Sequence, residues 1–188
     1  MNNVSGIILS GGKSSRMGQD KCELVYDGKT FLNIQIDKMK KVGITDIVVS
    51  GYRGTNCSEK VIKDDLMDGP ISGIYLGLKN IKNDRAYITS IDTPLIGENI
   101  ITDLIKKSFE LNSDIIVCRH NNKIEPLIAI YKTNIIDIII KQIDINDYKL
   151  MDLLSIVDCK YLDIDDNIYE KEFLNINYKD DYNKLLAR

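Results

Sequence analysis

Short apolar runs alternate along the chain with segments in which apolar residues recur at helical spacing. The runs predicted as buried strands are VSGIILSG (4–11), ITDIVVSG (44–51), RAYITSID (85–92) and SDIIVCRH (113–120). Between them, segments 31–43 and 98–112 each carry one apolar stripe and are predicted as helices. This alternation predicts right-handed crossovers and a mostly parallel sheet with helices on both faces, which is a three-layer αβα fold of the α/β class.

The second half of the chain has a less regular order. The segments 124–131 and 159–164 are predicted as strands, 133–143, 146–157 and 178–188 as helices, and 173–177 as a short extended piece. No linker rich in proline and serine, internal repeat or low-complexity tract interrupts the series. We therefore expect residues 1–188 to form one domain around a single core.

The composition is that of an ordinary globular protein, with 44% hydrophobic and 28% charged residues. No apolar run approaches the roughly 18 residues of a membrane span, and the first residues lack the basic segment of a secretory signal. We therefore expect a cytoplasmic protein without a membrane partner. The net charge of −3 argues against broad nucleic-acid binding, so any phosphate ligand must be bound by a local group of cations.

The cysteines and the histidine exclude several kinds of site. Cys22, Cys57, Cys118 and Cys159 lie too far apart in sequence for a zinc or redox pair, so reduced structural thiols are expected. His120 is the one histidine, and alone it cannot supply a Ser-His-Asp triad or a two-histidine zinc site. Chemistry that depends on an imidazole base is therefore not expected.

The loop LSGGKSSRMGQDK (9–21) follows the first predicted strand, and ligands of open parallel sheets bind outside the carboxyl ends of the strands. Its small residues are Ser10, Gly11 and Gly12, and its cations are Lys13, Arg16 and Lys21. Small residues let backbone N–H groups approach a phosphate, and the cations add charge. An ordinary turn with solvated cations is the alternative, but three cations in one loop of an acidic protein favour anion binding.

Two better-known phosphate loops do not fit this stretch. A Walker loop needs a glycine five positions before Gly12, where this chain has Ile7. The G-x-G-x-x-G spacing of the dinucleotide fingerprint is also absent. The loop therefore predicts a phosphate site of another type.

Asp92 ends the third predicted strand and is followed by Pro94, so its carboxylate is expected at the same edge of the sheet as the glycine loop. Magnesium is commonly held by one or two carboxylates together with substrate phosphates and water. Asp92 is therefore the predicted Mg²⁺ ligand, and the alternative is an aspartate that caps a turn or a helix.

Further along, Asp64 follows a short predicted strand, and Gly69, Pro70 and Gly73 precede a predicted helix. Glycines there would allow close approach of a base or a ribose, although Gly-Pro is equally a plain turn signal. Candidates for a second substrate are Glu125, Pro126, Asn175 and Asn177. From residue chemistry alone those four are mainly structural candidates.

The ordered motifs LSGGKSSRMGQDK, DLMDGPISGI, SIDTPLI, EPLIAIY and FLNINYKDDY resemble the molybdenum cofactor guanylyltransferase family. That family lies within the nucleotidyltransferases with a glycosyltransferase-A-like, Rossmann-like fold, the fold of the nucleotide-diphospho-sugar transferases. The motifs run from Leu9 to about Tyr182, and their combination is more specific than the first motif alone. The resemblance implies transfer of GMP from GTP to the terminal phosphate of molybdopterin, with release of pyrophosphate and with Mg²⁺ as cofactor.

The residues and the resemblance together imply roles for particular positions. The expected nucleotide-binding residues are Leu9, Ser10, Gly11, Gly12, Lys21, Ser50, Asp64, Gly69, Pro70 and Asp92. Arg16, Lys21 and Asp92 are the expected catalytic residues, with Asp92 also the metal ligand. Asn175 and Asn177 are expected on the molybdopterin side. The implied partners are the two substrates and, transiently, proteins that deliver molybdopterin or mature molybdoenzymes.

The chain departs from the family pattern in three places. Ser50 stands where the family usually has an asparagine against the nucleotide, which leaves that contact open. Ile91 replaces a frequent cysteine before Asp-Thr-Pro, which affects packing only. The two C-terminal asparagines lack the usual Thr-Pro after them, which bears on the molybdopterin side.

The implied reaction suits these residues because a phosphate monoester is already a nucleophile near neutral pH. Its oxygen would attack the α-phosphorus of GTP in line, and catalysis would consist of positioning and charge neutralisation. The alternatives are a relative that uses CTP or acts on a sugar phosphate, and a non-catalytic module that binds GTP or the cofactor. Nothing in the sequence places the hydrogen bonds that select the base.

Overall fold

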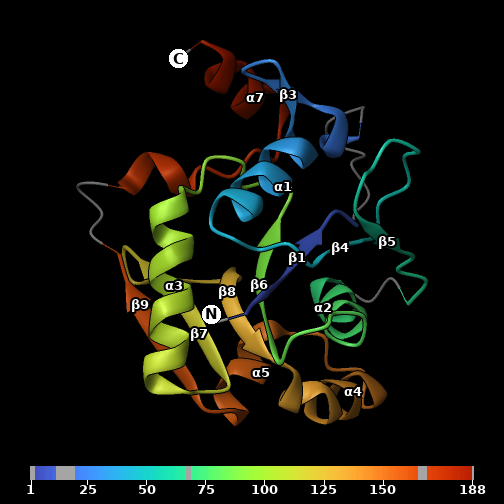
Figure 1. The fold of residues 1–188 in the computed structure, drawn as a ribbon, viewed down its shortest axis with the longest axis vertical. Helices are drawn as coiled ribbons and strands as arrows, with labels where there is room; N and C mark the ends of the chain where they lie inside the picture. Colours follow the sequence, from blue (N-terminus) through green and yellow to red (C-terminus); the bar gives the residue numbers. More distant parts are fainter. Residues whose placement is uncertain (1–2, 12–19, 67–68, 165–168, 188) are drawn as a thin grey trace.

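The computed structural model describes residues 3–11, 20–66, 69–164 and 169–187 of the chain. Within these residues lies a seven-stranded sheet (Figure 1). Its strands, in the order in which they lie side by side, are β5 (Lys60–Ile62), β4 (Ile47–Ser50), β1 (Ser5–Leu9), β6 (Arg85–Ser90), β8 (Lys123–Lys132), β7 (Ile115–His120) and β9 (Cys159–Asp163). Only β8 runs antiparallel to its neighbours in this described sheet, so the prediction of a mostly parallel sheet is confirmed.

Helices cover both faces of the sheet, as the alternation predicts (Figure 1). One hydrophobic cluster includes α1 (Phe31–Lys41), α3 (Glu98–Leu111) and α7 (Lys179–Leu186). The other includes α2 (Pro70–Leu78), α4 (Ile136–Asp144) and α5 (Leu150–Ile156). Shorter elements are β2 (Val25–Tyr26), β3 (Lys29–Thr30) and the 3-10 helices η2 (Lys21–Glu23), η3 (Thr133–Ile135) and η4 (Glu170–Phe173).

The sheet separates the two clusters because successive side chains of a strand point to opposite faces. In β1, Ile8 packs in the cluster of α1 and α3, whereas Ile7 belongs to the cluster of α2. Both side chains are fully buried, which explains why this strand reads as a continuous apolar run. Burial of each such side chain contributes about 1.5–3 kcal/mol to folding.

The structure differs from the predicted elements in three details. Gly73 lies inside α2 rather than before it. The helix predicted over 146–157 begins only at Leu150, because the carboxylate of Asp147 accepts a hydrogen bond from the Lys149 amide and forms a turn there. Phe173, predicted to begin the extended piece 173–177, is instead the last residue of η4, and Leu174 after it has an extended backbone.

Three strand ends coincide at one edge of the sheet and prepare a site there. Leu9, the last residue of β1, pairs with Ser50 of β4 on one side and with Ser90 of β6 on the other. The loops that follow these three residues in sequence therefore begin at the same edge of the sheet. Among the described residues, no helix is long and apolar enough to span a bilayer.

Candidate active site

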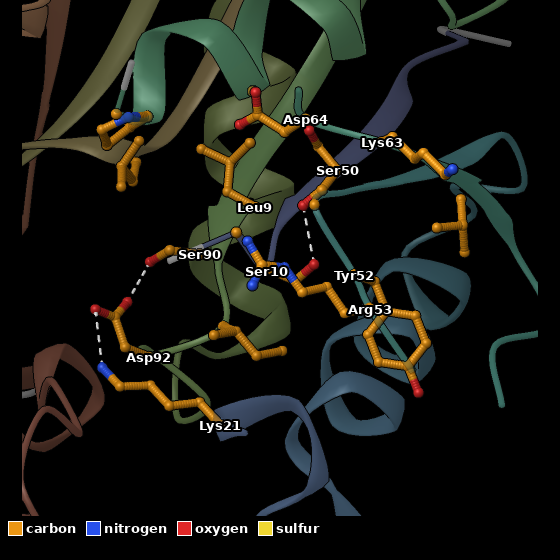
Figure 2. Close-up of a pocket in the computed structure, with 18 of the residues that line it drawn as sticks. Leu9, Ser10, Lys21, Ser50, Tyr52, Arg53, Lys63, Asp64, Ser90 and Asp92 are labelled. Carbon is orange, nitrogen blue, oxygen red and sulfur yellow. Dashed lines mark hydrogen bonds and ion pairs between the residues drawn. The ribbon is translucent and has the colours of Figure 1, made fainter. Parts of the chain in front are cut away.

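A cavity of about 1090 Å³, the larger cavity, lies at this edge of the sheet (Figure 2). The predicted nucleotide-binding residues that line it are Leu9, Ser10, Gly11, Lys21, Ser50, Asp64, Gly69, Pro70 and Asp92. The prediction that these positions converge is therefore supported by geometry. Gly12, Lys13 and Arg16 lie outside the described residues.

The turns after β1 and β4 are packed directly against each other. Gly51 has a φ of +82°, and a Cβ placed there would lie 2.6 Å from the Gly11 Cα and 2.8 Å from the Gly11 nitrogen. Only glycine at position 51 permits this approach. Both the amide and the hydroxyl of Ser10 donate to the Ser50 carbonyl, each at 2.9 Å. The Ser10 amide therefore shapes the turn, whereas the sequence suggested that it would face a phosphate.

The start of α2 forms a second wall of the larger cavity. Gly69 is the N-cap residue with a φ of +80°, and Pro70 occupies the first turn, where its missing N–H costs nothing. The Ser72 hydroxyl lies 2.8 Å from the Gly69 carbonyl and 3.3 Å from Asp64 Oδ2, so it ties the carboxylate to the helix. The N-terminus of a helix carries partial positive charge, which favours an anionic ligand in this cavity.

Gly73 is packed closely against side chains rather than against main chain. A Cβ on Gly73 would lie 2.9 Å from Leu9 Cδ2 and 3.3 Å from Ser50 Oγ. The helix therefore packs closely on the strand ends. Ser50 is buried, and its hydroxyl has no hydrogen-bond partner among the described residues, although the residue lines the cavity. It is a polar group that a ligand can satisfy.

Lys21 is directed into the site by a short 3-10 helix. The Asp20 carboxylate accepts a hydrogen bond from the Cys22 amide at 2.9 Å, and Cys22 and Leu24 are buried beneath η2. The Lys21 ammonium reaches Asn177 Oδ1 at 2.8 Å and Asp92 Oδ2 at 3.9 Å. Lys21 thus lies beside Asp92, as the sequence predicts, and it also contacts a residue near the other end of the chain.

Asp92 is held from three sides while its side chain remains partly exposed. The Ser90 hydroxyl donates to its Oδ1, and Lys21 lies against its Oδ2 (Figure 2). The Ile176 amide donates to its main-chain carbonyl at 2.8 Å. Its side chain keeps 27% of its surface exposed, enough for a ligand to reach the carboxylate.

The residues present are compatible with Mg²⁺ at Asp92. In the part of the chain that the structure describes, no three His, Cys, Asp or Glu side chains cluster as a complete metal site. A magnesium site of this kind takes its other ligands from substrate phosphates and water. One partly exposed carboxylate in the lining of a large cavity fits that donor set.

Helix α1 holds the loop that carries Asp92. The buried Gln35 side chain donates to the carbonyls of Ser90 at 3.1 Å and Thr93 at 3.0 Å. Lys38 donates to the carbonyls of Pro94 and Ile96, both at 2.6 Å. Burial lowers the pKa of the Lys38 ammonium to about 8.

The sequence analysis did not predict the contacts that Gln35 and Lys38 make with this loop. The available signal was a glutamine beside the apolar stripe of α1, between Leu32 and Ile36. A polar side chain among buried positions needs a hydrogen-bond partner.

The sequence analysis also did not name four further residues that line the larger cavity, Gly51, Tyr52, Arg53 and Lys63. They follow β4 and β5, so the rule that ligands bind at the carboxyl ends of strands could have indicated them.

A smaller cavity of about 210 Å³ adjoins the larger one. It is lined by Glu125, Pro126, Leu150 and Asn175, among others, and both cavities share Ser90, Asp92 and Leu127. Glu125 accepts from the Lys123 ammonium at 2.6 Å and lies 3.0 Å from His120 Nε2. Three of the four candidates for a second substrate are thus together, whereas Asn177 lies on Lys21.

The fold and the site define the class to which this protein belongs: an α/β nucleotidyltransferase domain with its site at the carboxyl edge of the sheet. The chain belongs to the family described as the MobA-like NTP transferase domain, which matches residues 6–158. It is similar to a molybdenum cofactor guanylyltransferase from Campylobacter jejuni (strain RM1221), with 30% identity over 192 residues, 100% of this chain and 98% of that protein.

Solved structures share the fold at lower sequence identity. Molybdopterin-guanine dinucleotide biosynthesis protein A from Archaeoglobus fulgidus superposes with a TM-score of 0.81 and 21% identity, covering 98% of this chain and 97% of that one. The 2-C-methyl-D-erythritol 4-phosphate cytidylyltransferase from Thermus thermophilus gives a TM-score of 0.70 and 9% identity, with 98% of each chain covered. The fold therefore occurs in proteins named for different nucleotides.

Proposed function

We propose that the protein transfers GMP from GTP to the terminal phosphate of molybdopterin and releases pyrophosphate. The observation that carries this proposal is the position of Asp92, which lies where the larger and the smaller cavity meet. Two substrates bound in the two cavities would bring their reacting phosphates together at that residue. The name of the relative at 30% identity supports guanylyl transfer to this acceptor.

The described residues can carry out the required steps. The packed turns at Gly11 and Gly51 line the larger cavity, where their main chain would contact the nucleotide, and the Lys21 ammonium would offset phosphate charge as pyrophosphate leaves. Asp92 would hold Mg²⁺, which when bound neutralises phosphate charge. Arg16, which we also propose for the leaving group, lies outside the described residues.

The acceptor needs no general base, because its phosphate is already ionised near neutral pH. In agreement with this, neither cavity is lined by His120. That imidazole instead stacks on the Phe173 ring, with the ring centroids 4.0 Å apart. The main contribution of the protein is to hold two phosphates in line. The same proposal includes transient contacts with proteins that deliver molybdopterin or receive the finished cofactor.

A pyrophosphate-release assay with each of the four nucleoside triphosphates, Mg²⁺ and molybdopterin tests the proposal. We expect release with GTP at a rate at least about tenfold above that with CTP, because a site that hydrogen-bonds one base edge leaves polar groups unpaired with another. Preference for CTP would mean that the protein transfers a cytidylyl group and not a guanylyl group. A cytidylyltransferase shares this fold, so CTP is the alternative to test first. Tight GTP binding with no release of pyrophosphate from GTP in the presence of any acceptor would contradict an enzyme altogether.

A further inference from the structure

Asn177 is in the described lining of neither cavity, but its side chain contacts Lys21, which lines the larger cavity. Its Oδ1 accepts a hydrogen bond from the Lys21 ammonium at 2.8 Å, whereas the nearer carboxylate oxygen of Asp92 lies 3.9 Å from the same nitrogen. The amide of Asn177 is therefore the closer of these two acceptors. Asn175, two residues earlier, does line the smaller cavity, so the two asparagines occupy different places.

The backbone around Asn177 is held on both sides. The preceding amide, that of the fully buried Ile176, donates to the Asp92 carbonyl at 2.8 Å. The Asn177 amide donates to Asp181 Oδ2 at 3.0 Å, and the Tyr178 amide donates to the same oxygen at 2.9 Å where α7 begins. The Asn177 side chain thus starts from a position fixed by the Asp92 loop and by a helix N-terminus.

A neutral acceptor suits a lysine that must bind phosphate. The Lys21 side chain has a flexible four-carbon stem, so its ammonium needs contacts that define its place before the ligand arrives. A carboxylate would orient the ammonium but also reduce its positive field, whereas an amide oxygen orients it and leaves the charge intact. An ammonium has three N–H donors, so a hydrogen bond to Asn177 is compatible with others to phosphate oxygens.

We propose that Asn177 is a positioning residue for nucleotide binding, which holds the Lys21 ammonium where it meets the triphosphate. The C-terminal segment that carries Asn177 thereby supports a residue of the larger cavity, although Asn177 is separated from Lys21 by 156 residues in sequence. The inference rests on the proposed function only for the identity of the nucleotide.

The test measures the dissociation constant of GTP in the presence of Mg²⁺ and without molybdopterin, for the wild-type chain and for Asn177→Ala, Asn177→Asp and Asn183→Ala. We expect Asn177→Ala to weaken GTP binding about tenfold, the loss typical of a hydrogen bond to a charged group. Asn177→Asp keeps the shape and the acceptor but adds negative charge, so it should weaken binding further. Asn183→Ala, in the exposed part of α7, is the matched control and should bind GTP like the wild type.

A double-mutant cycle separates action through Lys21 from direct contact with the ligand. In the background of Lys21→Met, the additional change Asn177→Ala should alter the dissociation constant of GTP less than about twofold, because the group that Asn177 positions is gone. A full additional loss in that background would overturn the inference. Thermal melting of each variant identifies a fold defect, and the isosteric Asn177→Asp remains informative if the alanine variant does not fold.

Other outcomes also decide the question. If Asn177→Ala keeps the wild-type affinity for GTP but has a raised KM for molybdopterin, Asn177 contacts molybdopterin. That result would overturn the inference. Equal losses in Asn177→Ala and Asn183→Ala would reduce the effect to general loosening of the segment and overturn it as well. If the wild-type chain binds CTP instead of GTP, guanylyl transfer fails while the same comparison, made with CTP, still tests Asn177.

Discussion

The larger cavity has a main-chain wall where the turns that follow two parallel strands meet, whereas the smaller cavity has a side-chain wall formed in part by residues within strand β8. Parallel strands β1 and β4 end at the larger cavity, and their turns meet at Gly11 and Gly51. Strand β8 is antiparallel, so it brings the middle of its own length, with Glu125 and Leu127, to the same edge. Strand direction thus decides whether a cavity is bounded by turns or by side chains, and each cavity should respond differently to mutation.

Asp92, one of the three described residues that line both cavities, should give the largest effect. We expect Asp92→Ala to lower turnover at least about a hundredfold, because it removes an electrostatic contact with the transition state. Asp92→Asn, which keeps the size of the side chain but not its charge, should lose nearly as much. Steady-state pyrophosphate release measures both, and Asp103→Ala on the exposed face of α3 is the control. Near-normal Mg²⁺-dependent turnover in Asp92→Ala would contradict the assignment.

A single methyl group in the main-chain wall should affect the larger cavity alone. In Gly51→Ala the new Cβ would overlap the Gly11 backbone, so the two turns must separate, and we expect GTP affinity to fall at least about tenfold. Gly28→Ala is the matched control, since Gly28 also has a positive φ, +74°, but no atom within 4 Å of its Cβ position. Both variants should lose about 1–2 kcal/mol of stability from backbone strain. Equal GTP affinity in the two variants would disprove the close approach.

The smaller cavity should show the opposite behaviour. We expect Asn175→Ala to raise the KM for molybdopterin about three- to tenfold, the loss of one hydrogen bond, while the dissociation constant of GTP stays the same. Titration of each substrate at a saturating level of the other separates the two constants. A change confined to GTP would mean that the side-chain wall serves the nucleotide.

The smallest effect concerns the support that the two cavities share. Burial lowers the pKa of Lys38 from 10.5 to about 8, so between these values the unfolded chain binds the proton that the folded chain has released. The free energy of unfolding should therefore rise with pH in this range relative to Lys38→Met. Urea unfolding at several pH values measures the difference, and Lys184→Met provides an exposed control. A difference that does not depend on pH would contradict a buried ammonium.

Much of this architecture is predictable because burial leaves a direct trace in the sequence. The runs 4–11 and 85–92 carry apolar residues at consecutive positions, and their strands are buried at every position, since helices cover both faces of the sheet. The convergence of Asp64, Lys21 and Asp92 follows from the rule that strand ends share an edge. The direction of β8 is not encoded in such a pattern, because it depends on pairing with β6 and β7.

The supporting contacts were harder to predict for a physical reason. Gln35 and Lys38 bond to main-chain carbonyls, which every residue carries, so no partner residue type signals the contact. The contact between Lys21 and Asn177 joins two ends of the chain, and only the fold brings them together. The resemblance to the family implies that Asn177 contacts molybdopterin, and that role is still a prediction. The role that we propose for Asn177 is to position Lys21.

The bond between Lys21 and Asn177 also sets an order of events during synthesis. A ribosome adds about 5–20 residues per second, so the asparagine is made roughly 8–30 s after the lysine that it contacts across 156 residues. Throughout that interval the nascent chain has its glycine turn and its first strand but lacks the acceptor that orients the ammonium. The affinity of the growing polypeptide for nucleotide should therefore mature late, after nearly all of the sheet has been translated.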